Sequence, residues 1–375
     1  MYGIKTKKVG ILLQPILKTE SNSNPVGAGI SVADTNWDNP SAGTQTFHPM
    51  IVDASSIKVS DVLNYGEIPN ATGDASVFQS KDRVMVSNKS VFPKVSMDIY
   101  PDALTFSIIS LLASQFATQG ASTNYNKTVT PRNELIDFKS GDGILGTIQG
   151  IDSAGYGFIL ENAVVDSLTI NISNSVGNVV ENVYKLSVVF AGRKITRATT
   201  TSKLFATLSG NGAIYYGSVN DSKTIIESIN FNSGDLVITN PCWKNLTITM
   251  NNNYEAFCMG PDGYLQGFTR NNPTISSKID IPYNDSTKTI LNRTGNGENY
   301  SFSIAKYGLG TTDPLYMKIS SLYNLATEDP ESVDGSKMGI SLTGNVLNTA
   351  GAGFSIVNAD GVDYLDKVFD TSQTN

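Results

Sequence analysis

The stretch that decides the fold is Gly157-Phe-Ile-Leu-Glu-Asn-Ala-Val-Val-Asp-Ser-Leu-Thr-Ile-Asn-Ile172. From Val164 onward, apolar side chains alternate with Ser, Thr and Asn, which is the period of a strand with one apolar and one polar face. In this alternation Asp166 falls on the apolar side. The sequence therefore predicts one long strand over residues 156–172, with a single charge on its buried face.

A similar pattern occurs a second time, at Asn240-Pro-Cys-Trp-Lys-Asn-Leu-Thr-Ile-Thr-Met-Asn251. It aligns without a gap with Asn162–Ser173, and Lys244 takes the place of Asp166 as the charge on the apolar face. A copied strand with a matching irregularity favours a duplicated β module. A chain rich in Asn and Thr can also produce such a match by chance, so both origins stay open.

One helix is expected near residues 101–118. Pro101 and Asp102 are residue types that favour a first helical turn. Apolar residues recur at helical spacing from Leu104 to Phe116, and Gly120 can end the helix. We expect an amphipathic helix that packs with its apolar side on a sheet.

The rest of the chain favours short strands. Residues 2–18 predict a first strand, residues 51–68 and 82–99 contain short alternating runs, and Val179–Ala191 predicts a hairpin partner for the long strand. Two stretches rich in small and polar residues, 19–50 and 121–150, predict long loops. Further strands are expected at 213–217, 224–231, 235–239, 244–259, 263–269, 274–282, 299–305, 316–322, 338–346 and 353–357.

These elements indicate a mainly β fold, a sandwich or barrel of the α+β kind with one flanking helix. Asp262-Gly263 is a strong hairpin signal between two of the strands. The composition becomes basic and rich in Thr over Arg193–Thr201, so we expect a domain boundary there. The chain then divides into a first β domain at 1–200, which includes the helix, and a second at 201–375, which a duplication of the module would make a copy of the first.

Composition narrows the classes of function. The 375 residues are 40% hydrophobic but only 16% charged, with a net charge of −7, whereas about a quarter of residues are usually charged. Ser, Thr and Asn supply the polarity, which suits sheets and subunit contacts, although an AT-rich coding sequence would produce the same bias. The negative charge argues against a dedicated nucleic-acid binder, which needs a basic face.

Reactive and metal-binding residues are few. The chain has one histidine, His48, and two cysteines, Cys242 and Cys258, too few for a Cys/His zinc site. No phosphate-binding loop, nucleophile elbow or H-E-x-x-H motif occurs. We expect His48 in a surface loop, and Asp329-Pro-Glu331 and Asp360-Gly-Val-Asp363 in turns. Asn358–Asp363 is weakly similar to a calcium-binding loop but lacks its terminal Glu. The sequence therefore predicts no catalytic, cofactor-binding or metal site, and a structural role rather than an enzyme.

No membrane segment is expected, because the longest apolar stretch, Leu104–Phe116, is shorter than the roughly 20 residues of a membrane-spanning helix. The N-terminus shows no secretory signal, since its apolar patch is short and lacks a small-residue cleavage site. Synthesis in a cytoplasm is the expected setting.

Two segments carry a resemblance to a known family. The long strand at 157–172, followed by Tyr184-Lys-Leu-Ser-Val-Val-Phe-Ala-Gly-Arg193, resembles the major tail tube proteins of tailed bacteriophages. The helix that precedes this strand pair, the opening Tyr2-Gly-Ile-Lys5 and the stretch Asn251-Asn-Asn-Tyr-Glu255 are similar to the order of elements in that family. The resemblance covers about half of the chain and consists of sandwich patterns rather than invariant residues.

The resemblance implies a virion protein that is assembled in the host cytoplasm. It implies self-association into stacked rings, trimeric if the chain carries two tube domains and hexameric if it carries one. The other implied partners are the tape measure, terminator and baseplate proteins, and DNA passes through the lumen without specific binding. Residues 19–50 and 121–150 are candidates for bridging the rings. We expect a negatively charged lumen, because a basic wall would retain phosphates.

Two other classes of function stay open. One is a different structural β protein, such as an accessory tail or baseplate component or a surface adhesion module, which would not close into rings. The other is a carbohydrate-binding or carbohydrate-cleaving β-sandwich, because the 16 Tyr and 15 Phe include side chains that could stack on sugars.

Overall fold

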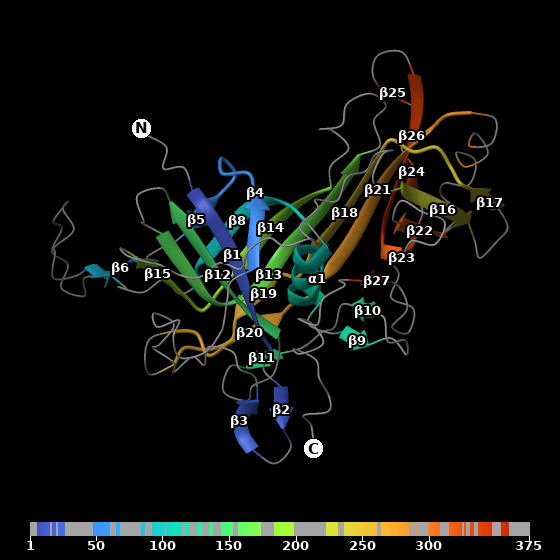
Figure 1. The fold of residues 1–375 in the computed structure, drawn as a ribbon. Helices are drawn as coiled ribbons and strands as arrows, with labels where there is room; N and C mark the ends of the chain where they lie inside the picture. Colours follow the sequence, from blue (N-terminus) through green and yellow to red (C-terminus); the bar gives the residue numbers. More distant parts are fainter. Residues whose placement is uncertain are drawn as a thin grey trace.

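The computed structural model describes residues 6–15, 17–19, 22–26, 48–60, 65–67, 84–86, 92–101, 103–114, 117–119, 126–129, 135–137, 144–152, 157–173, 184–198, 223–231, 236–260, 264–284, 287, 290, 299–307, 315–324, 326–327, 331–333, 337–346 and 354–359. This part of the chain is mainly β, with antiparallel sheets and the helix α1 (Ala103–Ser114), which confirms the predicted fold class (Figure 1).

Six strands of the first half close into a barrel. They are, in order around it, β1 (Thr6–Pro15), β4 (His48–Val52), β8 (Lys94–Tyr100), β14 (Lys185–Ala191), β13 (Gly157–Ser173) and β12 (Ile144–Asp152). Each strand pairs antiparallel with the next, and β12 pairs with both β1 and β13. Closure removes the free edges that an open sheet would present.

The long strand β13 connects this barrel to a second group of strands. Its first half pairs with β12 and with β15 (Lys194–Ala198), and its second half pairs with β14 and β18 (Asn245–Asn251). Beyond β18 the sheet continues through β21 (Thr274–Pro282) and β26 (Lys337–Asn345). Short strands lie along its margins: β5 (Lys58–Ser60) on β8, and β24 (Ala326–Thr327) and β25 (Glu331–Val333) on β26.

The two copies of the repeated pattern lie side by side in this sheet. Ile170 of β13 lies opposite Ile248 of β18, which is its own counterpart in the sequence alignment. Ser167 pairs with Asn251, and Ser173 with Asn245, so exchanging the copies reproduces the same register. A local two-fold axis therefore passes between Ile170 and Ile248. Duplication as the origin of this symmetry stays a prediction.

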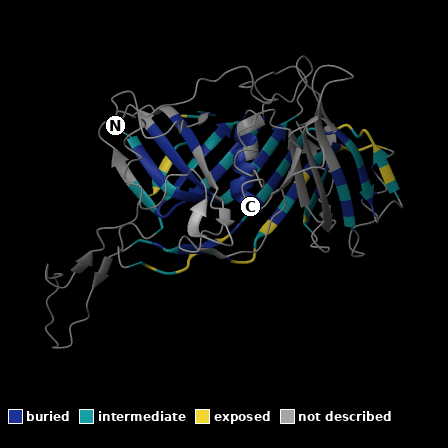
Figure 2. Ribbon diagram, turned by 60° about the horizontal axis from the view of Figure 1, so that its bottom comes forward, coloured by how far each residue is buried: buried dark blue, intermediate teal, exposed yellow. Residues whose placement is uncertain are grey.

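A second, seven-stranded sheet lies against the first. Its order is β17 (Leu236–Thr239), β16 (Lys223–Phe231), β22 (Asn299–Tyr307), β23 (Leu315–Asn324), β27 (Phe354–Ala359), β10 (Asn126–Val129) and β9 (Ala117–Gln119). Phe231 and Tyr300 of this sheet share one apolar core with Leu246 and Ile248 of the first. Figure 2 shows the buried residues as a band that runs through the large sheet, α1 and the second sheet.

Smaller units complete the described part. β19 (Tyr254–Ala256), β20 (Gly267–Arg270) and β11 (Leu135–Asp137) form a three-stranded sheet over a separate small core that contains Leu145, Val164 and Phe268. Two hairpins, β2 (Leu17–Thr19) with β3 (Asn22–Val26) and β6 (Tyr65–Glu67) with β7 (Val84–Val86), form separate two-stranded sheets.

The helix α1 lies within the predicted range, but the expectation that it is amphipathic is wrong. All of its described side chains, from Thr105 to Ser114, are at most 2% exposed. The helix contacts β12 and β13 of the large sheet on one side, and β10 and β27 of the second sheet on the other. A helix that is covered on both sides carries apolar residues all round.

Asn252 and Arg270 hold the C-terminal end of α1. The Asn252 side chain donates to the carbonyl oxygens of Ala113, at 2.8 Å, and Val165, at 2.6 Å. The Arg270 guanidinium donates to the carbonyls of Ala113 and Ser114 and to the Asn252 side chain. A cation at a helix C-terminus also complements the helix dipole.

The two predicted loops contain strands, so both loop predictions are wrong in the described residues. The stretch 19–50 contains β3 and the start of β4, and the stretch 121–150 contains β10, β11 and most of β12. The glycines of β12 suggested a loop, but Gly150 serves packing: the Phe158 ring occupies the space where a Cβ would lie. Residues 27–47 lie outside the described part.

Most of the other predicted strands are confirmed. β13, β16, β17, β21, β22, β23, β26 and β27 each lie within about two residues of their predicted positions. The 213–217 prediction and Asp262-Gly263 lie outside the described residues. Met259 and Leu265, which precede and follow Asp262-Gly263 in the sequence, pair with each other in an antiparallel bridge. β13 with β18, β10 with β27, and β11 with β20 all pair across the expected boundary near residue 200.

Candidate functional site

One face of the large sheet is polar and partly exposed across six neighbouring strands, β8, β14, β13, β18, β21 and β26. Along each strand, polar residues alternate with buried ones that belong mostly to the core. We call this surface the polar face, and its residues are Lys94, Ser96, Asp98, Ser167, Thr169, Asn171, Lys185, Ser187, Asn245, Thr247, Thr249, Asn251, Ser276, Lys278, Asp280, Ser341, Thr343 and Asn345.

Lys185 and Asp98 form an ion pair on this face. The Lys185 Nζ lies 2.5 Å from one carboxylate oxygen of Asp98, and the Ser187 hydroxyl donates to the other at 2.7 Å. The hydrogen bond to Asp98 raises the pKa of Lys185 above its usual value, against the opposing effect of partial burial. Nearby, two hydrogen bonds from Ser55 lower the pKa of Asp53.

Asp166 forms a second ion pair, with its carboxylate 2.8 Å from the Lys94 Nζ. The register of β13 shifts between Val165 and Ser167, and this bulge turns Asp166 away from the core, so the prediction of a charge on the buried face is wrong. The other carboxylate oxygen accepts a hydrogen bond from the backbone N–H of Tyr254 at 3.0 Å.

Cross-strand hydrogen bonds connect the uncharged residues of the polar face. The hydroxyls of Thr169 and Thr249 lie 3.5 Å apart, and Thr247 donates to the Asn171 side chain at 3.2 Å. These two contacts are related by the local two-fold axis. Asp280 accepts hydrogen bonds from Ser341 at 2.6 Å and from Asn245 at 3.1 Å, so its carboxylate is also held in place.

Positive and negative charges balance on the described polar face. The face carries three lysines, Lys94, Lys185 and Lys278, and two aspartates, Asp98 and Asp280. A third aspartate, Asp166, forms an ion pair with Lys94 and balances the remaining positive charge. At the margin, Lys58 of β5 pairs in register with Ser96, and Asp53 lies close enough to Lys185 to influence it electrostatically. This surface is therefore close to neutral, although the whole chain carries a net charge of −7.

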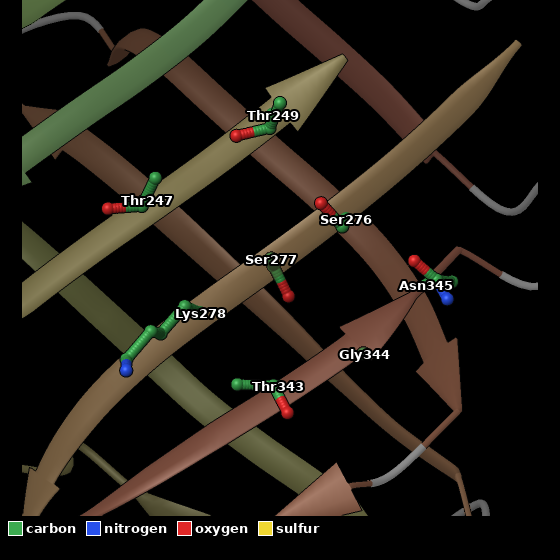
Figure 3. A pocket seen from close by; sticks show the side chains of 8 residues that line it. All are labelled: Thr247, Thr249, Ser276, Ser277, Lys278, Thr343, Gly344 and Asn345. Atoms are coloured by element: carbon green, nitrogen blue, oxygen red, sulfur yellow. The ribbon is translucent and has the colours of Figure 1, made fainter. Parts of the chain in front are cut away.

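The polar face contains a shallow hollow of about 360 Å³ over β18, β21 and β26 (Figure 3). Hydroxyl and amide groups dominate its lining, which consists of Thr247, Thr249, Ser276, Ser277, Lys278, Thr343, Gly344 and Asn345. Ser277 is buried, with its hydroxyl 2.9 Å from that of Tyr300. The lining contains no aromatic ring, so a sugar could not stack there as the carbohydrate-binding alternative requires.

The structure does not bring the residues that the sequence singled out into one place. His48 lies on β4 rather than in a loop, which corrects that expectation. Cys242 is exposed and Cys258 is half-buried, and both thiols are free. Glu331 begins β25 and Asn358 lies on β27, whereas residues 329–330 and 360–363 lie outside the described part.

Two findings concern only the described residues. They contain no group of three or more His, Cys, Asp and Glu side chains placed to hold a metal ion. None of their helices has the length and apolar character needed to cross a membrane.

Sequence reasoning missed the ion pairs of the polar face. The signal was present in Lys94-Val-Ser-Met-Asp98, where both charges occupy the polar positions of an alternating strand. The pairing itself was not readable, because Lys94 pairs with Asp166 across 72 positions of the sequence.

Comparison with known proteins adds no family to this description. No protein-family model matches the chain, and no curated protein matches it either.

Proposed function

We propose that this protein is a structural subunit, not an enzyme, that assembles into stacked rings to form the tail tube of a tailed bacteriophage. Such a tube is the conduit through which DNA passes into the host. The observation that supports the proposal most directly is the polar face, which is continuous across both halves of the chain and nearly neutral. If this face lines the lumen, the described part of the wall is nearly neutral rather than negatively charged as the sequence led us to expect, but a wall without excess positive charge would still let DNA pass without retaining its phosphates.

The direction of the strands is compatible with ring closure. The order β5-β8-β14-β13-β18-β21-β26-β24 contains eight strands that alternate in direction. Because the number is even, β5 and β24 at the two margins run in opposite directions. A copy rotated about an axis along the strands can therefore place its β5 antiparallel to β24 of its neighbour. The same patch would not meet itself, so the contact is heterologous and can close into a ring.

The size of such a ring follows from strand spacing. Strands lie about 4.8 Å apart, so 24 strands from three copies give a circumference of about 115 Å and a backbone diameter of about 37 Å, which strand tilt would widen. A duplex of DNA fits through this bore. Three copies correspond to the trimer expected if each chain supplies two tube domains, and six copies would give a much wider ring.

The remaining parts of the proposal follow from the resemblance in the sequence. The protein would be part of the virion, assembled in the host cytoplasm, with the tape measure, terminator and baseplate proteins as partners. Residues 144–150 are not proposed as ring bridges, because they belong to β12, which is one of the six strands of the barrel. Residues 27–47, 121–125, 130–134 and 138–143, which belong to the two predicted bridging stretches and lie outside the described strands, remain the candidates for that role.

Electron microscopy of the concentrated, purified protein tests the proposal. We expect rings or tubes of uniform bore with three-fold or six-fold symmetry. An accessory tail, baseplate or adhesion protein would instead give isolated particles. Native mass spectrometry of the smallest ring would then distinguish three copies from six. Isolated monomers at every concentration would contradict the proposal.

A further inference from the structure

Two lysines of the polar face, Lys94 and Lys185, lie where nucleic acid could reach them, and each is paired with a carboxylate that is held in place. The side chains of Lys94 and Lys185 are both 39% exposed, whereas their partners Asp166 and Asp98 are 14% and 23% exposed. The lysine heads therefore reach further into solvent than the carboxylates beneath them.

Hydrogen bonds fix the two carboxylates independently of the lysines. Asp98 accepts a hydrogen bond from Ser187, and Asp166 accepts one from the backbone of Tyr254. Each lysine is thus paired with a negative charge that belongs to the fold, rather than with mobile ions from solution. Both carboxylates would stay in place if the lysine side chains turned away.

Lysine binds DNA because a phosphate that it neutralises releases condensed counterions, which makes binding favourable and dependent on salt. A phosphate approaching Lys94 or Lys185 would have to break an ion pair and come close to a fixed carboxylate. Like charges at that distance repel. The free energy gained from counterion release is then offset at each of these lysines.

We propose that Asp98 and Asp166 act as built-in counter-ions that prevent Lys185 and Lys94 from binding the phosphates of nucleic acid. The biological meaning, a conduit wall that does not retain DNA, rests on the proposed function. The masking itself is a property of the surface and can be measured whether or not rings form. It also accounts for lysines on a face that, in the proposed tube, would line the path of DNA.

The test is binding of a short, fluorescently labelled DNA duplex to the full chain, followed by anisotropy between about 50 and 200 mM salt. The variants are Asp98→Asn, Asp166→Asn and the two combined, which keep the shape of each side chain. The matched control is Glu255→Gln, which changes the net charge by the same amount at an exposed position on β19, outside the polar face. Asp98→Asn combined with Lys185→Met removes the uncovered lysine again.

We expect the wild type and Glu255→Gln to bind equally weakly. Asp98→Asn should bind severalfold more tightly at the lowest salt, and its dependence on salt should steepen by about one unit for each uncovered lysine. The dependence on salt should steepen twice as much in the combined aspartate variant. The affinity of Asp98→Asn with Lys185→Met for DNA should return to the wild-type level. If Asp166→Asn does not fold, as judged by circular dichroism, Asp98→Asn alone carries the test.

Two results would overturn the inference: folded aspartate variants that bind no better than Glu255→Gln, or tight binding that persists after Lys185 is removed. Microscopy of the same samples separates this inference from the proposed function. Rings without a gain in DNA binding would refute the masking alone. A gain in binding without rings would refute the tube alone.

Discussion

Gly192 lies between β14 and β15, so close to β13 that a Cβ would lie 2.5 Å from the Leu160 Cδ1 and 3.0 Å from the Glu161 carbonyl oxygen. We therefore expect Gly192→Ala to lower the free energy of unfolding by about 1–3 kcal/mol, the usual cost of overpacking. Urea denaturation measures it. In a Leu160→Ala background the same substitution should cost less, because the closest atoms are gone. Equal costs in both backgrounds would show that Leu160 is not the obstacle.

Asn252 is fully buried and joins the end of α1 to β13. Asn252→Leu should lower the free energy of unfolding by about 2–4 kcal/mol, because it leaves two buried carbonyls without this donor and takes an acceptor from Arg270. The adjacent Asn251 is half-exposed on the polar face, so Asn251→Leu should change stability by no more than about 0.5 kcal/mol. Similar losses in chemical denaturation for both variants would contradict this role.

The ion pair of Lys185 predicts a dependence of stability on alkaline pH. Asp98 raises the pKa of Lys185 in the folded protein, whereas an unfolded lysine titrates near about 10.4. The pair therefore stabilises the fold below that unfolded value, and its contribution disappears as pH rises through the folded pKa. Because Lys185 is 39% exposed, we expect less than about 1 kcal/mol.

Lys185→Met should accordingly be less stable than the wild type at about pH 8, and the difference should narrow above about pH 10.4. Thermal unfolding at several pH values measures it. In an Asp98→Asn background, Lys185→Met should show no such narrowing. A difference that stays constant into the alkaline range would mean that the pair does not contribute to stability.

At the scale of elements, β17 is the outer strand of the second sheet, and Val237 on it is 47% exposed. An apolar edge strand is a template for unwanted pairing between chains. Val237→Lys should reduce light scattering of concentrated protein while changing the free energy of unfolding by no more than about 0.5 kcal/mol. The neighbouring Ile238 packs against the core, so Ile238→Lys should instead destabilise the fold. Unchanged scattering in Val237→Lys would exclude β17 as the site of association.

The position of an element could be predicted where its apolar and polar residues follow a single periodicity along the whole element. β21 follows strict alternation over Thr274–Pro282 and was predicted to the residue. β12 was missed because its glycines suggested a loop, whereas Gly150 is needed for contact with Phe158. The bulge at Asp166 was missed although the sequence carries a signal for it: Val164 and Val165, followed by Asp166 and Ser167, interrupt the alternation, which resumes at Leu168. α1 was placed correctly, but its burial depended on strands far away in the sequence.

At the scale of the whole molecule, the polar face could be predicted only in part. The alternation of Ser, Thr and Asn along β13 and β18 marked one polar side for each strand. That the two strands pair with each other, and so merge two faces into one, depends on contacts between residues about 80 positions apart. The near-neutral balance of that surface likewise differs from the net charge of the chain, because acidic residues elsewhere do not contribute to it.

The halves of the chain share one core, and this makes a prediction about independent folding. A sequence boundary near residue 200 suggests two domains, but the end of α1 in the first half is held by Asn252 and Arg270 of the second. β13 also needs β18 to cover one edge of its second half.

We therefore expect the fragment 1–200 to lack a cooperative unfolding transition on its own, because it would expose both apolar surface and unpaired backbone groups. Calorimetry of the full chain should show a single transition, and co-expression with the fragment 201–375 should restore it. Two separate transitions in the full chain, or a stably folded 1–200 fragment, would show instead that the halves are autonomous domains that merely share a sheet.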